Sequence, residues 1–396
     1  MDDDVGAEIR DLGHHAAGIL EHRLDRREAF VLQKHLVAPP FQRDVVVVGH
    51  AVEAAHLHTL GEEEFREVIA DAWRPFVDEI STSPLGSLHG LRRGQAAEPR
   101  PRILLAAHMD AIGLMVTGIA DGFLRFTEIG GIDPRILPGQ AVIVHGQKDL
   151  PAIVVQPADR LVKPEHGGSP LPMSDLLIDT GLLPDEVKSL IKVGDLVSFA
   201  IQPTELSENI LYGHSQDNRA SVAVITACLL ELQHIRHDWD VWAVASTQEE
   251  ETLGGGYTSP FAIRPTVAVA IDVTFAKGPG ANDWRAFGLG KGPTLGFGPN
   301  IHPALHNRFK SVAEKLDIPH QVEIMPRHSG TDAFAMQVVA EGIPSMVIGI
   351  PLRYMHTPVE MVSVKDIERA GHLLAQVIAG LAAEDVNSIR WEDTND

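Results

Sequence analysis

The sequence contains almost no cysteine. Its single cysteine, Cys228, lies in the apolar run 222–232 and has no second thiol with which to form an internal disulfide. We therefore interpret Cys228 as a packed thiol of the protein core. Because no disulfide framework is available, nothing in the sequence indicates an oxidising compartment, and we expect a cytoplasmic protein.

The sequence also lacks long apolar runs and an excess of basic residues. No run approaches the roughly 18 apolar residues of a membrane-spanning helix, and the start, MDDDVGAEIR, is acidic, without the apolar stretch of a secretory signal. The formal net charge is −21, whereas a nucleic-acid phosphate backbone binds a basic surface. We therefore expect neither a nucleic acid nor a membrane as a partner, and most of the acidic excess should be solvated surface.

The 396 residues suffice for two to three domains, and the character of the sequence changes along the chain. Residues 1–58 contain several histidines without ligand-like spacing, and we interpret them as an extension of uncertain order. Residues 118–203 contain short β-like runs separated by glycine and proline turns, which predict a small β-barrel. Residues 59–117 and 204–390 alternate helix and strand. We predict an α/β fold, in which a three-layer domain with a mixed sheet carries an inserted β-barrel domain.

Metal-binding side chains stand at or just beyond the ends of four apolar, strand-like runs, 103–107, 241–246, 266–271 and 345–350. The carboxyl ends of strands form the ligand crevice of open α/β sheets, so residues distant in the chain can meet there. Histidines and carboxylates together form a site for a divalent metal ion. The candidates are His108 and Asp110 after the first run, Glu249 and Glu250 after the second, Asp272 at the end of the third, His356 beyond the fourth, and Asp217 at the start of a helical pattern.

Each of these residues also has a simpler explanation when it is taken alone. Asp217 suits a helix N-cap, and the acidic run that begins at Glu249 would usually be a solvated surface.

In extended chain His108 and Asp110 point to one face, so His108 could bind a metal while Asp110 orients its imidazole. Glu249 and Glu250 would point to opposite faces of a strict strand, so the backbone must turn there for both to serve.

Other catalytic signatures are incomplete. The segment 213–215, Gly-His-Ser, resembles the start of a serine-hydrolase G-x-S-x-G elbow, but Asp217 replaces its second glycine. The glycine-rich segment 288–292 lacks the Ser or Thr that follows Lys in a phosphate-binding P-loop, so we predict an ordinary loop. There is no H-E-x-x-H motif. Neighbouring glutamates on one strand are poorly placed for glycoside hydrolysis, which needs carboxylates that face each other across the bond.

Taken in order, these segments resemble the M42 family of metallo-aminopeptidases, the glutamyl and tetrahedral aminopeptidase group, some of whose members carry a cellulase or endoglucanase label. The resemblance runs from about residue 60 to residue 381. It is carried by AAHMDAIGLMV, IGGIDPRILPGQ, SQDNRAS, STQEEE, AIDVT, LGKGP, SGTDAFA and IPLRYMHTPVE. Two segments depart from the family pattern. Asn218 stands where a second acid is usual, and Glu251-Thr252-Leu253-Gly254-Gly255 replaces Val-Gly-Leu-Arg-Gly.

The resemblance implies a dinuclear metal-dependent aminopeptidase that removes N-terminal residues from peptides with a free N-terminus. Each subunit would bind two divalent ions, with Zn or Co first and Mn as a further option. The inserted domain would be PDZ-like and would mediate dimerisation in a homo-oligomer of up to twelve subunits. The implied roles are one metal site of His108, Asp217 and Asp272, a second of Asp217, Glu250 and His356, Glu249 as general base, and Asp110 as the carboxylate that orients His108.

Two other functions stay open. A related dinuclear amidohydrolase, such as a deacylase or carboxypeptidase, would use the same ions on a different end of the substrate. A binding or scaffold protein could have kept the fold without catalysis. The residues do not determine the native metal, because Zn, Co and Mn all accept histidine and carboxylate ligands.

Overall fold

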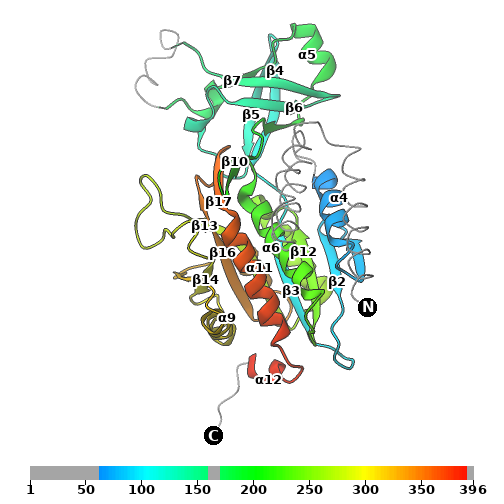
Figure 1. Ribbon diagram of the computed structural model, residues 1–396. Coiled ribbons are helices and arrows are strands. Elements are labelled where there is room, and N and C mark those ends of the chain that lie inside the picture. The colour runs from blue at the N-terminus through cyan, green and yellow to red at the C-terminus, as the bar shows by residue number, and fades with distance from the viewer. Residues whose placement is uncertain (1–61, 159–169, 390–396) are drawn as a thin grey trace, which may run out of the picture.

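The architecture is a large mixed sheet with a separate barrel at one end (Figure 1). The computed structural model describes residues 62–158 and 170–389, so the predicted extension 1–58 lies outside the described residues. Within these described residues the sheet has eleven strands, in the order β1-β2-β12-β3-β13-β16-β17-β11-β10, with β14 and β15 branching from β16. Their bounds are β1 (Glu79–Thr82), β2 (Leu88–Arg92), β3 (Arg102–His108), β10 (Thr204–Ser207), β11 (Ile210–Gly213), β12 (Asp240–Ser246), β13 (Val267–Phe275), β14 (Thr294–Phe297), β15 (Gln321–Ile324), β16 (Ser345–Arg353) and β17 (Glu360–Ser363).

The four strands at the centre of the sheet, β12, β3, β13 and β16, run parallel. Almost every residue of β3, β13 and β16 is buried, as expected for parallel strands covered on both faces. Ser246 pairs with His108, and Ala270 with Ala106, so Asp272 lies level with His108. The carboxyl ends of these strands therefore meet at one edge of the sheet.

Helices cover both faces of the sheet, as predicted. On one face lie α4 (Glu62–Trp73), α6 (Gln216–Leu232) and α11 (Val364–Ala379) (Figure 1). A Cβ added to Gly90 of β2 would meet Trp73 of α4 at 3.3 Å, while the neighbouring His89 binds Ser259 of α8 (Gly254–Ile263) on the other face. The other helices of the described residues are α5 (Pro184–Leu190), α7 (Glu249–Thr252), α9 (Pro303–Lys315), α10 (Asp332–Met336) and α12 (Asp385–Ile389), with short 3₁₀ turns at Pro134–Ile136 and Met173–Asp175.

The inserted segment forms a closed antiparallel barrel, as predicted, with its own apolar core. Its first strand begins at Gly113, ahead of the predicted boundary at residue 118, and its last strand ends at Phe199. The likeness to a PDZ domain remains a prediction. The strands, in barrel order, are β4 (Gly113–Ala120), β5 (Phe123–Ile129), β8 (Leu177–Asp179), β7 (Asp149–Val155), β6 (Ala141–His145) and β9 (Leu196–Phe199).

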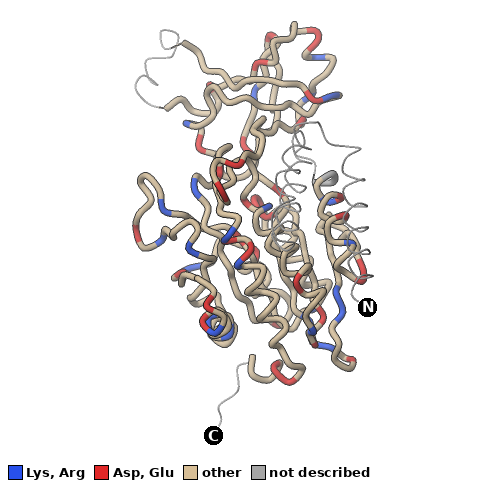
Figure 2. The backbone as a smooth tube through the Cα atoms, viewed as in Figure 1, with Lys and Arg blue, Asp and Glu red and all other residues tan. Residues whose placement is uncertain are grey.

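Two expectations from composition can be compared with the structure. Cys228 is fully buried in α6, and burial raises the pKa of its thiol above its ordinary value, which confirms a packed core thiol. Figure 2 shows Asp and Glu along both the barrel and the large sheet with its helices, and a mainly solvated acidic excess remains a prediction. In the described parts of the chain, no helix is both long and apolar enough to cross a bilayer.

The crossing of α6 and α11 requires a glycine. A Cβ on Gly371 would lie 2.6 Å from the Cβ of Ala227 and 3.1 Å from the carbonyl oxygen of Val224. We expect Gly371→Ala to reduce the free energy of unfolding by about 1–3 kcal/mol, since overpacking forces the helices apart. Urea denaturation measures this change. Gly380→Ala is the matched control, because a Cβ there meets atoms only at ordinary distances of 3.4 Å or more. Equal stabilities of the two variants would contradict the expectation.

Candidate metal centre

The structure brings the predicted residues together at the carboxyl edge of the central strands. Two groups of three have ligand atoms that all lie within 4.8 Å of one another, and Asp217 belongs to both groups. The seven residues are placed as follows: His108 ends β3 with Asp110 just beyond, Asp272 lies in β13, Asp217 in the first turn of α6, Glu249 and Glu250 begin α7, and His356 follows β16.

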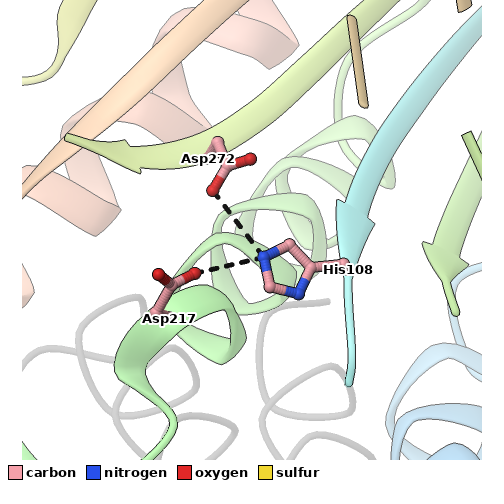
Figure 3. Close-up of side chains that lie close together, drawn as sticks. All are labelled: His108, Asp217 and Asp272. Carbon is pink, nitrogen blue, oxygen red and sulfur yellow. Dashed lines mark hydrogen bonds and ion pairs between the residues drawn. The ribbon is translucent and has the colours of Figure 1, made fainter. Parts of the chain in front are cut away.

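The first group consists of His108, Asp217 and Asp272, all of which are buried. Figure 3 shows both carboxylates directed at the same imidazole nitrogen. His108 Nε2 lies 3.1 Å from Asp217 Oδ1 and 3.9 Å from Asp272 Oδ1. One imidazole and two carboxylates form a donor set that suits a divalent ion.

The second group consists of Asp217, Glu250 and His356. His356 Nε2 lies 3.5 Å from Asp217 Oδ2 and 3.6 Å from Glu250 Oε2. The two oxygens of Asp217 thus face different histidines, as in a carboxylate that bridges two ions. The other oxygen of Glu250, Oε1, is buried and has no hydrogen-bond partner among the residues that the structure describes. Such an unsatisfied oxygen is costly in a folded protein, and a bound cation would satisfy it.

Local backbone conformation turns these side chains toward each other. Ser215 before α6, Gln248 before α7, and His356 itself have positive φ angles of 67°, 60° and 59°. Each such non-glycine residue costs on the order of 1–3 kcal/mol, and this strain is concentrated at functional sites. Because α7 begins at Glu249, successive side chains no longer point to opposite faces. This is the turn that the sequence required for Glu249 and Glu250 to serve together.

Asp110 contacts more than the imidazole that it was predicted to orient. His108 Nδ1 lies 3.1 Å from the backbone carbonyl of Asp110 and 3.6 Å from its carboxylate. The carboxylate oxygens accept hydrogen bonds from the backbone N–H groups of Glu249 and Glu250, each at 3.1 Å. With Nδ1 donating to the carbonyl, His108 Nε2 is free for a metal. Asp110 therefore also holds the start of α7.

Sequence reasoning missed Glu360, the first residue of β17. Its buried carboxylate accepts hydrogen bonds from the backbone N–H of Asp217 at 3.1 Å and of His356 at 2.9 Å. Glu360 therefore joins the backbones of two predicted ligands that are distant in the chain. The signal in the sequence was an acid between the apolar residues Val359 and Met361, where a strand that borders β16 would bury it.

The electrostatics of the centre show an excess of buried negative charge. Burial raises the pKa of Glu249 to about 8 and that of Glu250 to about 7, and raises the pKa of Asp272 and Glu360 well above the usual range. Asp217 differs, because hydrogen bonds from the two histidines outweigh its burial and lower its pKa. Without a cation these acids retain protons, so we expect metal binding to release protons.

The two histidines complement this charge. Burial opposes protonation of His108, but the carboxylates of Glu249 and Asp217 raise its pKa well above the ordinary value. The hydrogen bond to Asp217 is the main cause that raises the pKa of His356 to about 9. In the absence of metal, the histidines act as counterions to the acids, and a divalent ion would replace their protons.

The glycine-rich segment 288–292 is a loop, as predicted, and its amides are engaged within the protein. The N–H groups of Gly290 and Gly292 both donate to the carboxylate of Asp366 at 2.7 Å. A negatively charged carboxylate thus occupies the position that a phosphate would need.

A Ser-His-Asp chain lies in the barrel, outside the metal centre. His145 Nε2 is 2.8 Å from Ser198 Oγ, and its Nδ1 is 2.8 Å from Asp149. Ser198 is buried within β9, which pairs with β4 on one side and with β6 on the other. Amides in a strand paired on both sides are not available as oxyanion donors, which a serine nucleophile needs. We therefore assign this chain a structural role.

Comparison with known proteins shows the family to which the chain belongs. The sequence profile of the M42 glutamyl aminopeptidase family matches residues 86–373, well over half of the chain. The chain belongs to the M42 family. The predicted membership is therefore confirmed, and the protein is an enzyme that hydrolyses peptide bonds. M42 peptidases are metal-dependent, and the two groups that share Asp217 provide ligands of the kind that such enzymes need.

Similarity to individual M42 proteins extends over most of the chain. The lysyl aminopeptidase of Pyrococcus furiosus is 35% identical over 326 residues, 81% of this chain and 92% of the relative. The crystal structure of a TET aminopeptidase from a marine sediment Thaumarchaeota archaeon matches with a TM-score of 0.82 and 28% identity, covering 87% of this chain and 99% of that one. The TET1 peptidase of Pyrococcus horikoshii matches with a TM-score of 0.72 and 28% identity, covering 85% and 100%.

We expect the metal-free protein to lose stability as the pH rises from about 7 to about 9. Below this range the buried His89 and His214, whose pKa values are lowered to about 4 and about 3, take up protons on unfolding and oppose the effect. The folded pKa values of Glu249, Glu250 and His356 lie above those of an unfolded chain. The folded state therefore binds more protons in this window, and the free energy of unfolding falls with rising pH. The Tm in chelator should fall across the window, and Zn²⁺ should restore it most at high pH.

The double variant Glu249→Gln/Glu250→Gln is the control for this pH dependence. It removes two of the carboxyl groups whose pKa values are raised, so its Tm in chelator should decline less steeply with rising pH. A Tm of the unaltered protein that rises with pH in chelator would contradict the charge assignment.

We expect Glu360→Gln to weaken metal binding by about 10–100-fold, the usual effect of losing a partner that orients the ligands. The backbone N–H groups of Asp217 and His356 donate to different oxygens of Glu360, and in glutamine one of these two positions is an NH₂ group, which donates and cannot accept. Competition with a coloured chelator measures the affinity. Glu323→Gln is the matched control, because within the described part of the chain this partly buried carboxylate accepts from the hydroxyls of Thr274 and Thr294 and not from a ligand backbone. Equal metal affinities of the two variants would contradict this expectation.

Proposed function

We propose that the protein is a dinuclear metal-dependent aminopeptidase that removes residues from the free N-terminus of peptides. The observation that carries this proposal is the position of Asp217, whose oxygens face His108 on one side and His356 on the other. A further carboxylate, Glu249, lies 3.7 Å from His108 Nε2 and belongs to neither group of three ligands. A bridging ligand with a spare neighbouring acid is the arrangement that dinuclear hydrolysis needs.

The donor set indicates which residues would hold the ions. His108, Asp217 and Asp272 would bind one ion, and Asp217, Glu250 and His356 the other. Histidine with carboxylates suits Zn or Co, and also Mn. When bound, such ions make a water molecule more acidic and polarise the scissile carbonyl.

Glu249 is the general base in this proposal. Its pKa of about 8 without metal is raised by burial, so neighbouring cations would favour the ionised form that accepts a proton. Glu249 would take one proton from the attacking water, whose oxygen bonds to the carbonyl carbon. As the C–N bond breaks, Glu249 would return the proton to the leaving amine. Asp110 would direct Glu249 by holding its backbone N–H.

The partners in this proposal are peptides and further copies of the chain. The TET1 peptidase of Pyrococcus horikoshii can assemble into a tetrahedron or a large octahedral shell. We extend assembly to this chain as a homo-oligomer built from dimers, up to a dodecamer, with the inserted barrel as a PDZ-like dimerisation domain. Sedimentation of the purified protein measures its oligomeric state.

Glu249→Gln tests the catalytic assignment. The variant should keep its metal content and lose about 10²–10⁴-fold in kcat, because it cannot transfer the proton. Turnover of an aminoacyl-p-nitroanilide and elemental analysis measure the two properties. Glu314→Gln, which removes an exposed acid on α9, is the control and should retain full activity. An unchanged kcat in Glu249→Gln would reject the assignment of Glu249 as the general base. Equal cleavage of acetyl-capped and free peptides would reject the aminopeptidase in favour of another amidohydrolase.

A further inference from the structure

The loop that follows β5 runs from the inserted barrel to the metal centre. The carbonyl oxygen of Gly131 lies 2.8 Å from His356 Nδ1, across 225 residues of sequence. A carbonyl can only accept, so Nδ1 carries the proton and His356 Nε2 faces Asp217 and Glu250. A group from the inserted domain therefore fixes the orientation of a predicted metal ligand in the other domain.

The same loop packs directly against the ligands of the second group. A Cβ on Gly131 would lie 2.9 Å from His356 Nδ1. A Cβ on Gly130, whose φ is +73°, would lie 2.7 Å from Ile112 and 3.3 Å from the Oε2 of Glu250. The loop backbone thus forms a wall of the site, and glycine is required there both by conformation and by close approach.

A side chain on α7 ties this loop to the catalytic domain. Gly130 N donates to Glu251 Oε1 at 2.7 Å, across 121 residues of sequence. Glu251 is the third residue of the acidic run, directly after Glu249 and Glu250. One short helix thus provides the proposed base, a proposed ligand and the hydrogen bond to the loop of the barrel.

We propose that the Gly130–Gly131 loop and Glu251 form a positioning device through which the inserted barrel sets the orientation of His356. This inference rests on the proposed dinuclear centre and deepens it. Among the described residues, the proposed ligands that this loop contacts are Glu250 and His356, which belong to the same half of the centre. The affinity for the ion held there should therefore depend on the placement of the barrel, whereas the affinity for the ion held by His108 and Asp272 should not.

Titration with Co²⁺ tests this inference, using calorimetry to resolve the two ions and the variant His356→Ala to identify which one depends on His356. Gly130→Ala should reduce the affinity for that ion at least about tenfold. The affinity for the other ion should stay within about twofold of that of the unaltered protein. Gly181→Ala is the matched control. It introduces the same left-handed strain at φ +69° in the barrel, but its Cβ would meet nothing within 4 Å, so neither affinity should change.

Two variants of Glu251 test the tie separately. Glu251→Ala should reduce the affinity for the His356-dependent ion a few-fold. Glu251→Gln keeps an acceptor oxygen and should bind Co²⁺ like the unaltered protein. The metal-free Tm of both should match the unaltered protein, since the role is in positioning and not in folding.

The outcomes separate this inference from the proposed function. If the unaltered protein does not bind two Co²⁺ ions, both proposals fail. If it binds two, and Gly130→Ala weakens both equally, weakens neither, or behaves like Gly181→Ala, the positioning device is rejected and the dinuclear centre stands. Equal binding by Glu251→Ala and Glu251→Gln would reject the part assigned to Glu251.

Discussion

The double contact of the Asp217 carboxylate is the interaction on which the rest of the site depends. One oxygen faces the histidine at the end of β3, and the other faces the histidine that follows β16. This placement needs α6 to begin at the sheet edge, directly after a left-handed Ser215. Glu360 then holds the backbone N–H of Asp217. If the carboxylate turned, the two groups of ligands would no longer share a member.

The cost of this arrangement is a concentration of buried acids. Burial disfavours the ionised forms of Glu249, Glu250 and Asp272, and repulsion from neighbouring acids adds to this effect, so the pKa values of all three rise. We therefore expect the site to weaken the fold at neutral and higher pH unless cations are present. Binding and folding are coupled by charge, and the parallel strands supply the apolar support that keeps such a cluster in place.

The position of the barrel in the chain explains its contact with the site. The segment leaves the catalytic domain just after His108 and Asp110 and returns through β10 and β11 just before Asp217. Both ends of the barrel are therefore anchored beside the metal centre, and Figure 1 shows the barrel standing beyond that edge of the large sheet. A loop such as 130–131 needs to extend only a short way to reach His356.

The sequence by itself determined the class of the fold and the proposed ligands. Apolar runs that end in His or acid residues predicted which strands are buried, because parallel strands need apolar residues on both faces. The inserted barrel followed from its short strands. Only the tertiary structure decided that each Asp217 oxygen meets a different histidine, that Glu360 joins two ligand backbones, and that Gly131 orients His356. These contacts join a side chain to backbone or to another side chain over a hundred or more residues. They leave no periodic pattern in the sequence, because they arise only when separate strand ends are brought to the same edge of the sheet.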